Sequence, residues 1–396
     1  MPWIDFGLCL GALPALAASL YLLTFAALAR RKVHPAAPGS CLRFDVVVPA
    51  HDEEDGISRT VENLSALDYP SELFRVFVVA DNCRDRTAER AAAAGAQVLV
   101  HDGPKRRGKG YALAYAFNYS LAQGFADAVV VVDADSVVSR NLLSAFAARF
   151  EAGAGAVQAD YGVRNPHSTW RTRLMTIAFA AFHTVRSLAR ERLGLSCGLR
   201  GDGMGLTTAV LRAVPYCAFS IVEDIEYGLQ LGCAGYRVCY VPEVRVLGDM
   251  PVTEHASRSQ RHRWELGRRA LARRYVHKLL AETWRRQDPV LLDLALDLIV
   301  PPLAQLVVVN GIGVTLCLSV LRLGGGVRIA PWLWGASVCG LLLYVARAWA
   351  LSRVGLRGLL DLVWAPVYVC WKLALRFSAS ENGEDEWIRT TREARM

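Results

Sequence analysis

The N-terminal end of the chain contains a long run of residues without charge, from Phe6 to Ala29. A helix of these 24 residues, at ~1.5 Å rise per residue, covers the ~30 Å hydrocarbon core of a bilayer. A secretory signal peptide would carry its basic residues before the run, whereas here Asp5 precedes it and Arg30 to Lys32 follow it. The sequence therefore predicts a transmembrane helix within residues 1–32. Because basic flanks stay on the cytosolic side, residue 33 onward is expected in the cytosol.

Two further apolar runs, Leu298 to Leu321 and Ile329 to Ala346, are separated by a short Gly-rich turn and predict a transmembrane hairpin within residues 291–346. A fourth run, Leu359 to Leu375, contains charged residues together with Trp and Tyr, a pattern typical of a helix at the membrane surface. We expect this interfacial helix and a cytosolic tail in residues 347–396. These features predict an integral protein of a bacterial inner membrane or plasma membrane, with a cytosolic central domain.

The charge and the cysteines exclude some classes of protein. The net charge is +8, and much of the excess is arginine near the apolar runs, so we expect an anionic lipid leaflet rather than a nucleic acid as the partner. Several of the ten cysteines lie inside apolar runs, and no C-x-x-C pair occurs. The sequence therefore predicts neither a disulfide framework nor a cysteine metal cluster, which suits a reducing cytosol.

Residues 33–290 contain short β-branched runs that alternate with helical patterns. This succession predicts an α/β domain with a parallel, doubly wound sheet. The alternation is regular in residues 43–150 and less regular in residues 151–290. The expected strands are 44–48, 76–80, 97–100 and 128–133, and the expected helices are 57–67, 87–94, 110–123 and 141–150.

Polar side chains follow several of these strands, at the edge where open α/β sheets bind their ligands. The segment Pro49 to Glu53 follows the first strand, and Asp81 to Thr87 follows the second. Within the latter, Asp85 and Thr87 are typical helix caps, so Asp81 is the better candidate for function. The basic, glycine-containing segment Lys105 to Gly110 leads into a helix and suits a diphosphate, although many surface loops have this composition.

Asp133 and Asp135 follow four valines and place two carboxylates at the mouth of a buried strand. Hard oxygen ligands suit Mg²⁺ or Mn²⁺, although acids at strand ends are also common without a metal. Further along, Val222 to Asp224 contains paired acids, which equally suit the start of a helix. The segment Gln260 to Trp264 lies among many arginines and, taken alone, suits a basic interfacial helix. Asp202, in a Gly-rich segment, is left open between a site residue and a turn former.

Taken together and in this order, the motifs resemble those of glycosyltransferase family 2. The resemblance is greatest to membrane-bound, processive-type members such as cellulose, hyaluronan, chitin-oligosaccharide and poly-N-acetylglucosamine synthases. It runs from about Asp45 to Trp264 and implies a GT-A-like, Rossmann-like fold. The sequence departs from the family pattern at Asp52, where the family has Asn, and at Val222, where the family has Thr. The resemblance makes residues 43–150 the nucleotide-sugar half and residues 151–290 the acceptor half, with a basic interfacial helix.

The resemblance also implies roles for individual residues on the donor side. Glu53 would help to hold the base and ribose, and Asp81 would accept a hydrogen bond from a uracil ring. Lys109 and Arg263 would contact the diphosphate, and Asp133 would contribute to donor binding.

On the acceptor side, the resemblance places the catalytic base at Asp224. Trp264 would stack against the acceptor sugar, with Gln260 beside it. A divalent metal, Mg²⁺ or Mn²⁺, would be held by Asp135 and Asp133.

The implied activity is inverting, metal-dependent transfer of a hexose-type sugar from a UDP-sugar to a polysaccharide, giving a β-linkage. Single transfer to a membrane lipid of the ceramide or polyprenyl type is an alternative, since three membrane spans are few for a polysaccharide channel. A homo-oligomer or a secretion partner could supply the rest of such a channel. A non-catalytic scaffold is a further alternative, which the presence of Asp135, Asp224 and Trp264 disfavours.

Overall fold

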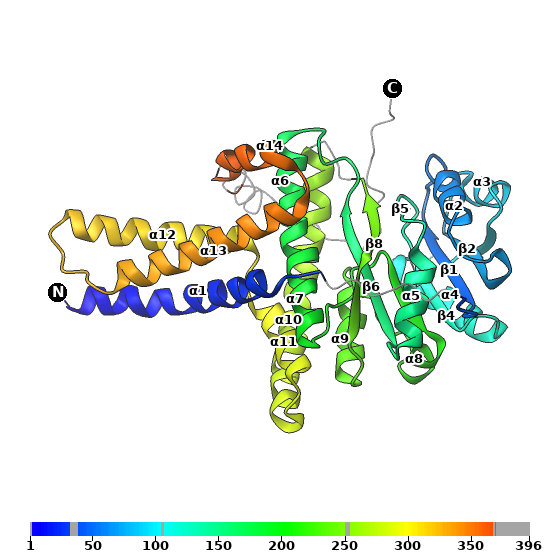
Figure 1. Ribbon diagram of the computed structural model, residues 1–396, viewed down its shortest axis with the longest axis horizontal. Coiled ribbons are helices and arrows are strands. Elements are labelled where there is room, and N and C mark those ends of the chain that lie inside the picture. Colours follow the sequence, from blue (N-terminus) through cyan, green and yellow to red (C-terminus); the bar gives the residue numbers. More distant parts are fainter. Residues whose placement is uncertain (1, 32–38, 104–106, 250–253, 367–368, 370–396) are drawn as a thin grey trace.

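The computed structural model describes residues 2–31, 39–103, 107–249, 254–366 and 369, and for residues 254–263 it describes the helical backbone alone. Figure 1 shows three layers along the long axis of the molecule: a bundle of apolar helices, a middle layer of helices that run across the end of this bundle, and a sheet flanked by shorter helices.

The sheet of the described residues has eight strands in the order β3-β2-β1-β4-β7-β6-β8-β5. The first four neighbours are parallel, as predicted. The prediction of a wholly parallel sheet is wrong, because β7 runs antiparallel to β4 and β6, and β5 runs antiparallel to β8. The strands are β1 (Phe44–Ala50), β2 (Phe74–Asp81), β3 (Gln97–His101), β4 (Ala128–Val131), β5 (Val137–Val138), β6 (Ala156–Val163), β7 (Met204–Thr207) and β8 (Val238–Gly248).

The central strands are buried on both faces. In β1, Val47 belongs to one hydrophobic cluster, whereas Val46 and Val48 belong to another on the opposite face. Successive side chains of a strand point to opposite faces, so an unbroken valine run is what a sheet covered on both sides requires. The α4 helix (Lys109–Gln123) covers the first face, and the second is covered by α2 (Ile57–Ser65), α3 (Thr87–Ala93) and α5 (Leu142–Glu151).

The middle layer contains a helix that changes pitch. The α6 helix (Trp170–Phe179) continues through a π-helical segment (Ala180–Val185) into α7 (Arg186–Leu193). The apolar stretch Met175 to Leu188, whose pattern predicts a helix, lies within this composite helix. The α8 (Thr208–Ala213), α9 (Glu223–Cys233), α10 (Glu254–Arg286) and α11 (Pro289–Ile299) helices complete this half, and short 3₁₀ turns occur at Ser71–Leu73 and Leu362–Trp364.

Three helices of the described residues are long and apolar enough to cross a membrane: α1 (Pro2–Leu28), α12 (Leu303–Arg322) and α13 (Ala330–Ser352). The second begins later than predicted because Pro301 and Pro302 separate it from α11. The Asp5 carboxylate accepts backbone N–H bonds from Ile329 and Ala330, so α1 caps the start of α13. Of the predicted interfacial run, α14 (Gly355–Asp361) and the turn after it are helical, and its end lies outside the described residues.

A cluster of ion pairs joins the bundle of membrane-length helices (α1, α12 and α13), called the membrane bundle below, to the middle layer. Arg190, which is only 2% exposed, contacts Asp293 and Asp297 of α11, each at 2.7 Å. The Tyr21 hydroxyl of α1 donates to Asp293 at 2.7 Å. Arg186 contacts Asp297 at 3.0 Å. A buried charge needs such partners to be tolerated, so these contacts fix α1, α7 and α11 against one another.

Candidate active site

The candidate site begins where β4 ends. Asp133, two residues after Val131, forms an ion pair with the Lys109 ammonium, in which Lys109 Nζ lies 2.5 Å from Asp133 Oδ1. Lys109 is the first residue of α4 and also donates to the Gly201 carbonyl at 2.7 Å. Burial alone would lower the pKa of Lys109, but the Asp133 and Glu223 carboxylates outweigh this effect and raise it. A fixed, permanently charged ammonium therefore lies at the carboxyl edge of the sheet.

A glycine-rich loop brings the second half of the chain to this ammonium. Gly198, Gly201 and Gly203 all have positive φ, a conformation that only glycine adopts without strain. Gly201 lies against both Lys109 and the predicted base: a methyl group there would come within 3.2 Å of Lys109 Nζ and 3.4 Å of Asp224 Oδ2. The predicted base and the predicted diphosphate ligand therefore lie next to the same residue.

Asp202, which the sequence left unassigned, supports the strand end. Its buried carboxylate accepts the Asp133 N–H at 3.0 Å and the Ser136 hydroxyl at 2.6 Å. Burial, followed by the nearby Asp133 charge, raises the pKa of Asp202 to about 8. Asp202 thus fixes the turn that carries Asp133 and Asp135.

The predicted base lies in the first turn of α9, where a helix favours acidic side chains. Burial raises the pKa of Asp224, against the opposing effects of the Ile225 N–H, Lys109 and Arg200. Burial likewise raises the pKa of Glu223 to about 8, although Lys109 opposes this rise from 3.8 Å. A carboxylate with a raised pKa is the kind of group that accepts a proton near neutral pH.

The α10 helix approaches this acidic turn closely. A methyl group at Gly267 would lie 2.7 Å from a Val222 methyl carbon, so glycine is needed for the two helices to meet here. Three residues earlier, Trp264 is 39% exposed, and its ring centroid lies 6.3 Å from that of Phe179. Trp264 therefore has an exposed face and lies beside α6, three residues before the point where α10 meets the start of α9. The side chains of Gln260 and Arg263 lie outside the described part of the chain.

The donor-side acids lie at the ends of β1 and β2. Asp81 is buried, and its carboxylate accepts bonds from His101 at 2.6 Å and from the Asn82 amide at 2.9 Å. Glu53 is half-buried and donates its N–H to the Thr87 hydroxyl at 2.8 Å. These acids lie at the predicted edge of the sheet, but their contact with a nucleotide stays a prediction.

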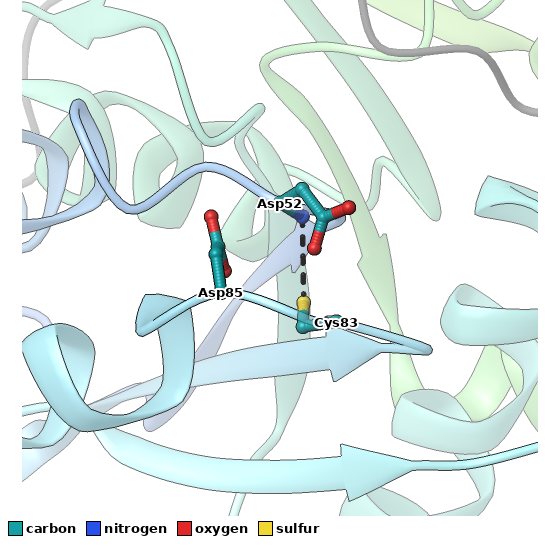
Figure 2. A group of neighbouring side chains, drawn as sticks. All are labelled: Asp52, Cys83 and Asp85. Carbon is teal, nitrogen blue, oxygen red and sulfur yellow. Dashed lines mark hydrogen bonds between the residues drawn. The ribbon is translucent and has the colours of Figure 1, made fainter.

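Asp52, Cys83 and Asp85 form a group that could in principle hold a metal (Figure 2). The Asp52 carboxylate accepts the Arg84 N–H at 2.7 Å, and the Asp85 carboxylate accepts the N–H groups of Glu54 and Thr87. Burial raises the pKa of the Cys83 thiol to about 11, which disfavours the thiolate that a metal prefers. The hydrogen bonds of this group therefore hold the loop after β1 against the loop after β2. Asp52 also has φ of 53°, which Asp and Asn tolerate alike and which explains the replacement of Asn.

The predicted metal residues, Asp133 and Asp135, present carboxylates on one tight turn, closed by a Ser136 N–H bond to the Asp133 carbonyl at 3.1 Å. This all-oxygen donor set fits Mg²⁺ or Mn²⁺. Lys109 already engages Asp133, and the metal site at Asp135 and Asp133 stays a prediction.

A family model described as glycosyltransferase-like family 2 matches residues 42–267 of the chain, which include the site and the start of α10. The chain belongs to glycosyltransferase family 2. The mixed α/β sheet, with its acids at the strand ends, is accordingly the GT-A-like fold that the motifs implied.

Curated relatives match roughly three fifths of this family 2 chain. It is 24% identical over 260 residues to the probable glycosyltransferase YdaM of Bacillus subtilis, covering 64% of this chain and 60% of the relative. It is 30% identical over 240 residues to the β-monoglucosyldiacylglycerol synthase of Synechocystis sp., covering 58% and 48%, respectively. The chain thus spans about half the length of these curated relatives.

One solved structure resembles the family 2 chain over almost its whole length. The mannosyltransferase PcManGT of Pyrobaculum calidifontis, solved with GDP-Man and Mn²⁺, has a TM-score of 0.52 and 18% identity, covering 95% of this chain and 97% of that one. This likeness supports the fold, including its membrane-length helices.

Proposed function

We propose that the protein is an inverting glycosyltransferase that moves a sugar from a UDP-sugar to an acceptor held at the membrane and forms a β-linkage. The observation that carries this proposal is the position of Gly201, which lies against both the Lys109 ammonium and the Asp224 carboxylate. Inverting transfer needs a base at the attacking hydroxyl and positive charge at the departing diphosphate. One residue of the glycine-rich loop contacts both of these groups.

Each residue of the site has its own role in the proposed transfer. Asp224 takes the proton of the acceptor hydroxyl as the oxygen attacks the anomeric carbon. Lys109 stabilises the diphosphate that leaves from the opposite face of the sugar. A divalent metal held by Asp135 and Asp133 would neutralise further phosphate charge. Asp81 and Glu53 would hold the uridine.

For the acceptor, we favour a membrane lipid. The three membrane-length helices of the described residues pack directly against one another, with α1 against α13 through a 2.8 Å hydrogen bond between Ser19 and Ser337. This packing favours an anchor over a polysaccharide channel. One relative is named as a glucosyldiacylglycerol synthase. Elongation of a polysaccharide is the second candidate, which the Gln260 to Trp264 motif favours.

The test is to incubate membranes that contain the chain with a panel of radiolabelled UDP-sugars and to separate the products by solvent extraction. A labelled lipid soluble in chloroform and methanol supports lipid transfer, whereas label in a large, insoluble polymer supports elongation. Membranes with Asp224→Asn are the matched control. Absence of transfer from every UDP-sugar to either fraction would contradict the proposal.

A further inference from the structure

Four arginines gather around two aspartates at the junction between the membrane bundle and the site. Arg186 and Arg190 lie on α7, Arg200 on the glycine-rich loop, and Arg268 on α10. The aspartates are Asp293 and Asp297 of α11, so the cluster contains two more positive than negative side chains.

The surplus falls on two of the arginines. Arg190 and Arg186 form ion pairs with the aspartates of α11. Arg268 donates to the backbone carbonyls of Asp297 and Val300, and Arg200 donates to the Cys197 carbonyl at 2.8 Å. Within the described residues, neither Arg200 nor Arg268 forms an ion pair, and Arg200 Nε is shielded from solvent without a hydrogen-bond partner.

Such an arrangement is costly for the protein alone. A buried guanidinium donor without a partner loses its hydration and gains nothing in return. Burial accordingly lowers the pKa of both Arg200 and Arg268. An anion that contacted both arginines would remove this cost.

Both arginines lie near the ring of Phe182. Their guanidinium carbons lie 4.4 Å (Arg200) and 6.0 Å (Arg268) from the centre of the Phe182 ring, in the π-helical segment. Arg200 also lines a cavity of about 20 Å³ with Asp297 and apolar residues of α11. This space is enough for a water molecule, so an oxygen atom fits beside the guanidinium.

The positions of Arg200 and Arg268 in the fold indicate which molecule would supply the anion. Arg200 directly precedes Gly201, whose α-carbon faces Asp224. Arg268 contacts the Val300 carbonyl, where the chain turns from α11 toward the membrane helix α12. The donor diphosphate is assigned to Lys109, which contacts Gly201 instead. A ligand held by both arginines would therefore extend from the base toward the bilayer.

We propose that Arg200 and Arg268 form a subsite for the anionic group, phosphate or carboxylate, of the membrane lipid that accepts the sugar. The inference rests on the proposed function, of which it specifies the acceptor class. The lipid chain would lie along the membrane helices, and its acidic group would place the acceptor hydroxyl next to Asp224.

The test uses the full chain in neutral-detergent micelles with a fluorescent phosphatidic acid as the probe. Unlabelled phosphatidic acid, oleic acid and diacylglycerol compete for the probe in separate titrations. We expect at least one of the two acidic lipids to compete roughly tenfold or more better than neutral diacylglycerol, since hydrogen bonds to a charged group are the stronger kind. Phosphatidic acid alone would indicate a phosphate acceptor, and oleic acid alone a carboxylate acceptor.

Arg200→Gln and Arg268→Gln should remove this preference, and Arg200→Lys should retain part of it. Arg273→Gln changes an exposed arginine of the same helix and should have no effect. Equal competition by all three lipids in the unaltered protein overturns the subsite, and so does an equal loss in Arg273→Gln. UDP titrated into the same samples separates the two proposals: UDP binding without a lipid preference contradicts the subsite alone, whereas absent UDP binding contradicts the proposed function.

Discussion

Lys109 and Asp133 form a 2.5 Å ion pair that joins the first residue of α4 to the end of β4. The same ammonium lies 3.8 Å from Glu223 of the second half of the domain. One cation thus contacts both halves of the domain, between which we propose that the nucleotide-sugar binds. Its charge is already in place before the donor arrives, so little reorganisation is needed when diphosphate charge develops.

Lys109→Met should weaken UDP binding by roughly tenfold or more, because a hydrogen bond to a charged group is worth about 1.5–3 kcal/mol. Lys109→Arg should recover only part of the affinity, since the planar guanidinium does not reproduce a point charge. Calorimetric titration with UDP measures both effects. Lys278→Met, at an exposed position of α10, is the matched control. Equal UDP affinity in Lys109→Met and the control would remove Lys109 from the donor site.

Asp224→Asn should lower sugar transfer by roughly 10² to 10⁴-fold, the usual contribution of a general base, while UDP binding survives. The amide keeps the shape of the side chain but accepts no proton. Transfer is measured by product assay, and UDP binding by calorimetry. Should more than about a tenth of the transfer remain, the base would be another residue. Glu223→Gln would then be the next variant to assay.

Transfer should also depend on pH. Asp224 must be ionised to act as a base, and burial raises its pKa, so kcat/KM should fall with decreasing pH before solvent-exposed aspartates become protonated. Glu223→Gln should move this limb to lower pH, because it removes a neighbouring carboxylate that titrates with Asp224. The measurement is kcat/KM across the acidic and neutral range. A limb at the pH of an ordinary exposed aspartate would contradict the assignment.

Chelation should stop transfer if Asp135 and Asp133 hold a catalytic metal, and added Mn²⁺ or Mg²⁺ should restore it. Asp135→Ala should lose both the rate and the metal-dependent part of UDP affinity, in contrast to Asp224→Asn. Asp85→Ala changes the neighbouring group of Asp52, Cys83 and Asp85. It should leave the metal response intact, because the Asp85 carboxylate binds backbone N–H groups. Full activity in EDTA would exclude the metal.

The basic flank after α1 predicts a cytosolic site, which labelling in intact cells can test. Cys217 is exposed and Cys83 is half-buried, whereas Cys197 is buried and suits no labelling experiment. An impermeant maleimide should leave Cys217 unmodified until the membrane is permeabilised. Ready modification in intact cells would place the domain outside.

Local sequence predicted the nucleotide-sugar half well. The unbroken valines of β1 and β4 and the acids that follow them identify strands buried on both faces, with their ligand edge. The start of α12 was predicted too early, at Leu298, although Pro301 and Pro302 interrupt the apolar run.

The missed features depend on contacts between distant residues. Asp202 and Arg200 lie on a loop whose course depends on three glycines with positive φ, and local composition does not say where such a loop points. Arg190 pairs with Asp293 across 103 positions, a partnership that no local pattern contains. Glycine spacing in the segment Ser196 to Met204 was the available signal for a constrained loop.

The contacts of Arg190 with α11, and of α11 with Tyr21, affect the height of the candidate site above a bilayer. A domain on a flexible tether samples many heights above a bilayer and can meet substrates of many lengths. Here buried charge joins α7 and α11 to α1, and apolar side chains pack α9 against α11, so the acidic turn of α9 is held at a fixed height relative to the membrane-length helices. In the proposed transfer, a hydroxyl would then be glycosylated only if its own molecule carries it to that height.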